Sequence, residues 1–238
     1  MIDWLIEHYN WQAMLVHLLG LVILTKITWR IAFSVPAIRD MREWNAREDK
    51  PKKAIPKYRP IIKANAKIGL YLHLVFFLLL VPFVITFEAQ PWWKYLTDAL
   101  LIILVYDFLY YLMHRFLFHG PILKRVHGLH HQCRDISFID SRYVHPVETF
   151  MGSALFFATA VGLPAVLGDF HVASFIAAQF VWNNVNQINH TKFNLDYFPY
   201  KAVDYLTTMH AKHHIDMNHG NYSTLSPLYD WMFGTLEK

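Results

Sequence analysis

Long apolar stretches separated by short polar segments dominate the pattern of hydrophobic and polar positions along this 238-residue chain. A helix needs about 20 mostly apolar residues to cross a bilayer, and five stretches have roughly that length. We therefore expect an all-α, polytopic membrane helical bundle that forms a single domain over residues 1–238. The expected spans are residues 11–33, 68–88, 95–114, 149–168 and 170–189.

Local signals refine these spans. Pro82 is expected to kink the second span, because proline removes a helical hydrogen bond. Trp92 and Tyr95 stand where the third span begins, as aromatic residues do at a membrane interface. Gly168 and Asp169 leave only a tight turn between the last two stretches, which therefore predict a helical hairpin. The open alternative is a hairpin that only dips into the membrane.

The polar segment between the first two spans is strongly basic. Ten lysines and arginines, against four acidic residues, lie between Arg39 and Lys67. Such loops stay in the cytoplasm by the positive-inside rule, so the N-terminus is expected outside and is not a cleavable signal. Counting crossings from this loop places residues 115–148 and 190–238 together on the cytoplasmic side. These two segments are expected to form a histidine-rich, metal-binding cap.

Composition agrees with a membrane protein and narrows its chemistry. Apolar residues make up 55% and charged residues 17%, against about 45–50% and 25% in soluble domains. The mean hydropathy is +0.21. A lone cysteine, Cys133, excludes an internal disulfide and a cysteine-ligated iron–sulfur cluster. The net charge of +4 is modest and the basic residues concentrate in one loop, so we expect no nucleic-acid partner.

Histidine carries the strongest chemical signal. The chain holds 15 histidines, and the pattern His-x-x-His-His occurs twice. Positions i, i+3 and i+4 emerge from one face of a helix within one turn. Imidazole binds zinc, copper, iron and nickel well, so two facing triplets would hold more than one metal ion. The triplets are His127/His130/His131 and His210/His213/His214.

Three further histidines are candidate ligands. His114 and His119 end the third span, and their i, i+5 spacing would bring them towards one face if the helix contained a π-bulge. The open alternative is two interfacial histidines. His190 follows an amide-rich stretch that predicts a polar cavity at the end of the fifth span, because buried amides need partners. His190 is expected to be a ligand, the alternative being an ordinary hydrogen-bonded histidine.

Acidic side chains near these histidines are candidates for orienting them or balancing the metal charge. Asp107 lies seven residues before His114 and hence on the same helix face, inside a membrane span where an acid is costly. Glu148 follows His145 at the start of the fourth span; there it could equally interact with the helix dipole. The remaining histidines outside the triplets are expected to be structural, except for His219, which stays open; they are His8, His17, His73 and His171.

The nine candidate ligands suit two metal ions rather than one. Zinc would take four ligands, often mixed, and magnesium and calcium prefer oxygen. An all-nitrogen set at a bilayer surface therefore points to iron that activates O₂. The expected ligands are His114, His119, His127, His130, His131, His190, His210, His213 and His214.

The ordered set of motifs resembles the fatty acid hydroxylase/sterol desaturase superfamily of integral-membrane di-iron oxidases, over residues 107–235. Several members have a histidine where this chain has Asn186, four residues before His190, so Asn186 is a further candidate for weak or water-mediated binding. The matching pieces are Asp107, His114 with His119, both triplets, His145 to Glu148, Asn186 with His190, Asn221 with Tyr222, and Pro227 through Asp230 to Gly234.

This resemblance implies a function. The expected cofactors are two iron ions with O₂ as co-substrate, and the expected reaction is hydroxylation of a C–H bond in a membrane lipid. Because nothing resembles a fused cytochrome b5 domain, electrons are expected from an external donor of the cytochrome b5, ferredoxin or flavin-reductase type. The expected location is a bacterial inner membrane rather than the endoplasmic reticulum. The supporting residues would be Asp107, His145, Glu148, Asn186, Asn221 and Asp230.

Other functions stay open at this point. A lipid desaturase or methyl oxidase would use the same chemistry. A metal transporter would instead place its ligands near the middle of the membrane. A haem b electron carrier would need paired histidines on facing spans, for which His17 and His73 are the candidates.

Overall fold

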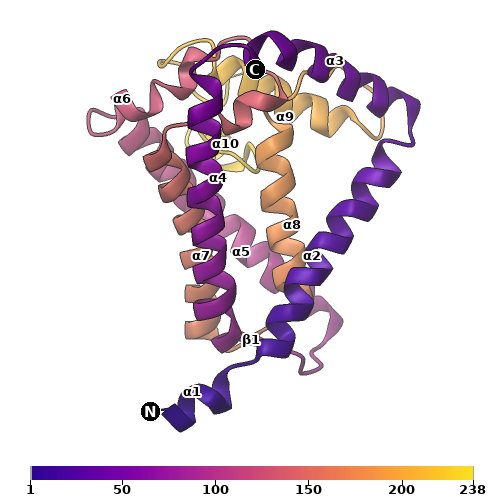
Figure 1. Ribbon diagram of the computed structural model, residues 1–238, viewed down its shortest axis with the longest axis vertical. Coiled ribbons are helices and arrows are strands. Elements are labelled where there is room, and N and C mark those ends of the chain that lie inside the picture. The colour runs from indigo at the N-terminus through magenta and orange to yellow at the C-terminus, as the bar shows by residue number, and fades with distance from the viewer. Residues whose placement is uncertain (1, 238) are drawn as a thin grey trace.

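The computed structural model describes residues 2–237 as a mostly helical bundle with one wide end. Figure 1 shows the long helices converging at the end that holds the strands, beyond which the short N-terminal helix lies, and carrying most of the other short helices at the opposite end. We call this wide end the cap. The helices are α1 (Ile2–His8), α2 (Trp11–Ala32), α3 (Pro36–Lys53), α4 (Tyr58–Val75), α5 (Trp92–Leu112), α6 (Lys124–His127), α7 (Pro146–Leu167), α8 (Val172–Ile188), α9 (Lys201–His213) and α10 (Leu228–Met232).

Four helical segments within residues 2–237 are long and apolar enough to cross a membrane. Many large apolar side chains on these segments are exposed, such as Leu19, Leu79 and Val166, as expected of surfaces that face lipid. The four segments are Leu5–Ala32, Tyr58–Phe83, Trp92–Phe118 and Pro146–Leu167. The chain is therefore a multi-pass membrane protein.

The fifth expected span corresponds to α8 and stays a prediction. This helix has 17 residues, or about 26 Å at 1.5 Å per residue, slightly less than the apolar thickness of a bilayer. It packs against α2 and α5 inside the bundle. Trp182 of α8 stacks on Phe156 of α7 with ring centroids 4.2 Å apart, at the centre of the aromatic core.

The basic segment between the first two spans is helical, which corrects the expectation of a loop. Pro36 occupies the first turn of α3, where a missing N–H costs nothing, and the helix lies across the cap (Figure 1). The second span begins at Tyr58 rather than at residue 68, because its polar first turns pack against the cap loops. Asn65, for example, donates to the carbonyl oxygens of Arg142 and Val144.

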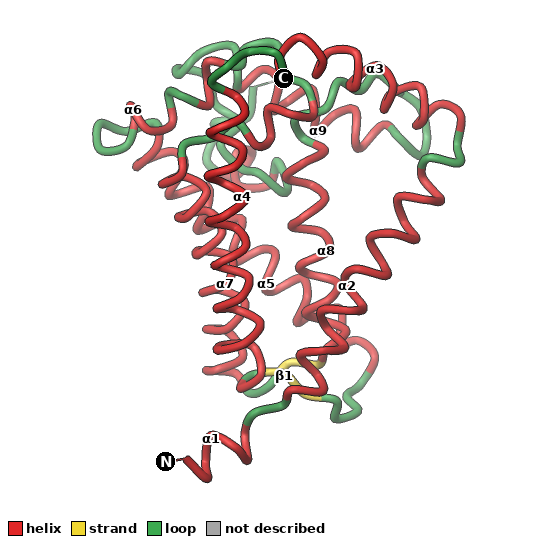
Figure 2. Tube along the Cα trace, in the orientation of Figure 1, coloured by secondary structure: helices red, strands yellow, loops and turns green. Residues whose placement is uncertain are grey.

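The end opposite the cap contains two strands that the sequence did not predict. β1 (Ile85–Thr86) and β2 (Phe170–His171) pair in parallel, and Figure 2 shows them at the narrow end, whereas most loops gather in the cap. The expected irregularity at Pro82 is present: the helix becomes π-helical at Phe76–Leu80 and 3₁₀ at Val81–Phe83. Gly168 ends α7 with φ 91°, a conformation that favours glycine, and turns the chain into β2.

Candidate metal centre

All nine expected ligands gather in the cap, in two groups. In each group the potential ligand atoms lie within 4.8 Å of one another. The five-histidine group consists of His114, His119, His127, His131 and His213, and the four-histidine group of His130, His190, His210 and His214. Each His-x-x-His-His triplet is thus divided between the two groups, so each group contains residues from both triplets.

The first triplet does not lie on one regular helix, contrary to expectation. α6 ends at His127, residues 128 and 129 form a turn, and a 3₁₀ segment covers His130–Gln132. The break rotates His130 away from its neighbours and towards the second group. The second triplet follows the expected pattern, since His210 and His213 lie on α9 and His214 caps its end.

His114 and His119 meet because the third span ends in a π-helical segment, Met113–Phe118. The amide of His119 donates to the carbonyl of His114, five residues earlier, at 2.9 Å. The extra residue in this turn brings both rings into the five-histidine group, with centroids 5.0 Å apart. This is the π-bulge that the i, i+5 spacing required.

Several ring nitrogens face one another in an arrangement that fits a bound cation. The Nε2 atoms of His114 and His127 are 2.9 Å apart, and those of His130 and His190 are 3.0 Å apart. In all four rings Nδ1 contacts a carbonyl or carboxylate oxygen, which can only accept, so Nδ1 carries the proton. Two Nε2 lone pairs then point at each other, an arrangement that a metal ion between them stabilises.

Oxygen acceptors orient most of the nine rings from behind, as is usual for metal-bound histidine. His127 donates to Glu148, and six other rings donate to backbone carbonyls through Nδ1. Those carbonyls belong to Tyr222 for His114, Met217 for His119, Tyr143 for His130, Asn186 for His190, Gly220 for His213 and Cys133 for His214.

Burial keeps most of these imidazoles neutral. It lowers the pKa of His190 to about 3, and the neighbouring His130 acts in the same direction. Burial, reinforced by adjacent imidazoles, also lowers the pKa of His127, His131, His210, His213 and His214. The neutral ring is the form that binds a metal ion, so the donor set fits a transition metal.

The expected supporting acids act differently from each other. Glu148 Oε1 lies 2.9 Å from His127 Nδ1, and its Oε2 is buried without a hydrogen-bond partner among the described residues. Within residues 2–237, Asp107 forms no hydrogen bond with a histidine. Instead it accepts from the amides of Thr224, Leu225 and Ser226 and thereby holds the loop that follows Tyr222, whose carbonyl orients His114.

Asn186 forms hydrogen bonds through both its side chain and its backbone. Its side-chain oxygen accepts from the Thr224 hydroxyl at 2.7 Å, and its backbone carbonyl accepts from His190. His145 belongs to neither group, and its Nδ1 accepts from the Val147 amide as the N-cap of α7.

Asn221 and Asp230 hold the C-terminal segment against the cap. Asn221, at φ 61°, donates to the carbonyl of Met209 and accepts from the amide of Glu237. Asp230 accepts from the amides of Tyr222 and Ser223. Both side chains therefore fix the loop that carries the carbonyl acceptors of the five-histidine group.

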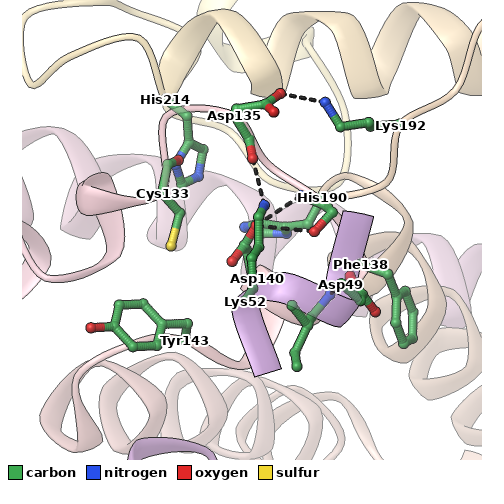
Figure 3. Close-up of polar contacts among 12 residues, drawn as sticks. Asp49, Lys52, Cys133, Asp135, Phe138, Asp140, Tyr143, His190, Lys192 and His214 are labelled. Atoms are coloured by element: carbon green, nitrogen blue, oxygen red, sulfur yellow. Dashed lines mark hydrogen bonds and ion pairs between the residues drawn. The ribbon is translucent and has the colours of Figure 1, made fainter. Parts of the chain in front are cut away.

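A buried network that the sequence did not reveal supports the four-histidine group. Asp140 accepts from the Lys52 ammonium and, at 2.8 Å, from the Tyr58 hydroxyl. Figure 3 shows Lys52 of α3 between Asp140 and Asp135. The network fixes residues 133–143, whose Cys133 and Tyr143 carbonyls orient His214 and His130. The one sequence signal for this network is a capping box, in which an acidic residue stands three positions after Ser137.

The histidines expected to be structural lie outside both groups. His17 and His73 both pack against Phe77, with ring centroids 4.9 Å and 6.4 Å from the Phe77 centroid. They do not face each other across a gap that could hold a haem. His171 caps α8, and His8 also lies outside the groups. His219, which the sequence left open, pairs with Glu237 at 2.6 Å.

Comparisons with known proteins agree with this site. The family model described as fatty acid hydroxylase matches residues 99–235, more than half of the chain. The chain is 30% identical over 159 residues to methylsterol monooxygenase 2-2 of Arabidopsis thaliana, covering 63% of this chain and 56% of that protein. It is 27% identical over 163 residues to the very-long-chain aldehyde decarbonylase CER1 of the same plant, covering 63% and 25%.

A rice protein, the very-long-chain aldehyde decarbonylase GL1-8 of Oryza sativa subsp. japonica, is 29% identical over 159 residues, covering 63% of this chain and 56% of that protein. The chain thus spans between a quarter and little more than half of the length of these relatives. No solved structure matches the chain significantly.

Proposed function

The chain belongs to the fatty acid hydroxylase family of membrane histidine-box oxidases, and from that premise we propose that it hydroxylates a C–H bond of a membrane lipid with O₂. The balanced reaction is R–H + O₂ + 2 e⁻ + 2 H⁺ → R–OH + H₂O. The two electrons come from an external donor of the cytochrome b5, ferredoxin or flavin-reductase type.

The observation that carries this proposal is the pair of adjacent all-histidine groups with facing Nε2 atoms. The five-histidine group would hold one iron ion and the four-histidine group the other. If bound there, two iron ions would supply the redox chemistry by which O₂ oxidises an unactivated C–H bond, with the electrons coming from the external donor.

The chain's own residues prepare this centre. The backbone carbonyls behind the rings fix each Nε2 towards the ions and set the tautomer. Glu148 places the carboxylate nearest to the rings, on His127, where it offsets part of the positive charge that neutral imidazoles leave. Asp107 holds the Thr224–Ser226 loop in place from inside the third span.

The cap is proposed to face the cytoplasm. Basic α3 lies at the same end of the bundle as both histidine groups (Figure 1), and positively charged segments near spans favour the cytoplasmic side. A bacterial inner membrane is the proposed location. There the lipid would reach the centre sideways from the bilayer, and the electron donor from the cytoplasm.

Methyl oxidation is the second candidate reaction, because a relative with 30% identity is a methylsterol monooxygenase. It uses the same centre and differs in the carbon that is attacked. Incubating membranes that contain the chain with ¹⁸O₂, followed by untargeted lipid mass spectrometry, distinguishes the two. A labelled secondary alcohol indicates chain or ring hydroxylation, whereas a labelled primary alcohol or acid indicates oxidation of a methyl group.

Substitution of one ligand from each group tests the proposal. His130→Ala removes a ligand of the four-histidine group, and His213→Ala one of the five-histidine group. Both variants should lose ¹⁸O incorporation altogether, and elemental analysis should show about two iron ions in the original chain and a deficit in each variant. His219→Ala, outside both groups, is the matched control and should keep both. Retained turnover in either ligand variant would refute the proposal.

A further inference from the structure

A large cavity lies where the sequence predicts a polar one, at the amide-rich end of α8. Its volume is about 790 Å³, within the range of about 300–1,000 Å³ that is usual for small-molecule sites. α2 forms one wall with Trp29 and Phe33, α8 forms the opposite wall, and α3 covers the cap side with Met41. Figure 1 shows α2 and α8 diverging towards α3, which bridges them.

The divergence of the two helices has an identifiable origin. α2 and α8 approach each other closely at Gly20, where a Cβ atom would lie only 2.7 Å from Ile176 Cδ1. Nearer the cap the two helices diverge, and the side chains of both that face this space line the cavity. The cavity is therefore a built feature of the fold and not a local gap in packing.

Three side-chain amides line the α8 wall: Asn183, Asn184 and Gln187. The Asn184 Nδ2 donates to the carbonyl of Phe180 at 2.8 Å, and Gln187 Nε2 donates to the carbonyl of Asn183 at 2.9 Å. A carbonyl only accepts, so these bonds fix which end of each amide is nitrogen. The Asn184 and Gln187 oxygens, and the whole Asn183 amide, have no hydrogen-bond partner within residues 2–237.

Several other polar residues around the cavity are already engaged or exposed. Asp49 accepts from the Ile139 amide at 3.0 Å, and Asn45 bonds the backbone of Lys192. Arg42 is exposed, with its guanidinium over the Phe33 ring at 4.3 Å. Among the α8 amides, the groups without a partner within residues 2–237 are therefore three oxygens, which accept, together with the N–H groups of Asn183, which donate; a hydroxyl group satisfies both kinds.

We infer that this cavity binds a neutral lipid that carries a hydroxyl group, which donates to the side-chain oxygens of Asn184 and Gln187. The apolar part of the lipid packs against Trp29 and Phe33. A carboxylate or phosphodiester has no such proton and would face unpaired amide oxygens, whereas a pure hydrocarbon would leave them unsatisfied.

The same site sets where oxidation would occur, a step that rests on the function proposed above. Gln187 precedes His190 of the four-histidine group by three residues, which is roughly 5 Å along the axis of α8. Asn183 lies two turns before His190 and on nearly the same side of the helix. A hydroxyl held by these amides keeps the oxidised carbon near the polar end of the lipid rather than at a remote chain end.

Photolabelling tests binding without relying on turnover. Purified chain in phosphatidylcholine nanodiscs is irradiated with a hexadecanol that carries a diazirine and an alkyne, or with the matched hexadecanoic acid or methyl ether. Peptide mapping should show the alcohol attached to α2, α3 and α8 around the cavity, several-fold more than the acid or the ether.

Two variants probe the chemistry and the space separately. Gln187→Met keeps the size of the side chain but removes its acceptor, and should lower labelling by the alcohol roughly fivefold, the effect of one neutral hydrogen bond, without changing labelling by the ether. Ala46→Trp fills the cavity from α3 and should lower labelling by all probes. The matched controls are Gln90→Met at the narrow end and Ala54→Trp, which is exposed where α3 ends.

Equal labelling by the alcohol and the ether in the original chain, or a preference for the acid, would overturn the inference. Unchanged labelling in the Ala46→Trp variant, when that variant elutes as a single species, would also overturn the inference. These results leave the proposed function untouched if iron and ¹⁸O incorporation persist. Conversely, elemental analysis could find no iron in the original chain while the alcohol still labels the cavity. That outcome would uphold the binding site and refute the proposed function.

Discussion

The five-histidine and four-histidine groups adjoin each other, yet the rest of the molecule holds them in different ways. The five-histidine group is tied to the spans themselves, through the π-helical end of the third span and through Glu148 at the start of α7. The four-histidine group depends on the loop at residues 133–143, which Asp140, Lys52 and Tyr58 fasten to α3 and α4. We expect the first group to be the more rigid and the second to be the easier one to disturb.

Acidification should have the largest effect, and it acts on both groups. Burial lowers the folded-state pKa of these histidines, so the unfolded chain binds more protons below its own pKa of about 6.5. Stability is therefore present above that pH and lost as the pH falls below it. The loss in metal-free protein should be on the order of 2 kcal/mol per buried histidine at pH 5. Thermal unfolding of chelator-treated protein from pH 8 to 5 measures this, and a flat profile would contradict it.

The same titration with metal bound sharpens the comparison. Protons compete with the ions for Nε2. The four-histidine group has one ligand fewer, so its ion should leave first, giving two steps of metal release on lowering the pH. A single step in which both ions leave together would mean that the groups do not differ in this respect.

Asp140→Ala should disturb the four-histidine group selectively. It leaves the Lys52 ammonium, whose side chain is only 17% exposed, without its carboxylate, at a cost of about 3 kcal/mol of unfolding free energy. Metal content should fall towards one ion per chain, as elemental analysis would show. Asp135→Ala is the matched control, because that carboxylate is exposed and should cost under about 1 kcal/mol. Equal losses from both variants would argue against a role for the buried network.

Glu148→Gln should act on the other group. It removes the charge behind His127 and should weaken binding of one ion about 10- to 100-fold, since oriented carboxylates contribute that much to metal affinity. Competition with a chelator of known affinity measures the change. An effect on both ions, or on neither, would show that Glu148 is not specific to the five-histidine group.

Tyr58→Phe should have the smallest effect. It removes the hydroxyl that donates to Asp140 but keeps the ring stacked on Tyr143 at a centroid distance of 4.1 Å. The expected loss is about 1 kcal/mol in unfolding free energy, with both ions retained. A loss as large as that from Asp140→Ala would mean that the hydrogen bond from the hydroxyl contributes as much to stability as the whole Asp140 carboxylate.

The membrane spans were the most predictable part of the fold. Four of the five expected spans match helices long enough to cross a bilayer, because apolar length alone carries that information. The helical form of the basic segment and the pairing of β1 with β2 were missed. Both depend on contacts with distant residues, such as the backbone pairing of Ile85 with Phe170.

The sequence alone identified the nine histidines that the structure brings together, because imidazole chemistry and spacing are written in residue type and order. Tertiary structure decided which of them belong to the five-histidine group and which to the four-histidine group. The break after His127 sends His130 to the other group, and Asp107 holds a loop instead of a ring. Those outcomes follow from where segments roughly 80 to 120 residues apart come into contact, as between His131 and His213 at 3.1 Å, which no local pattern encodes.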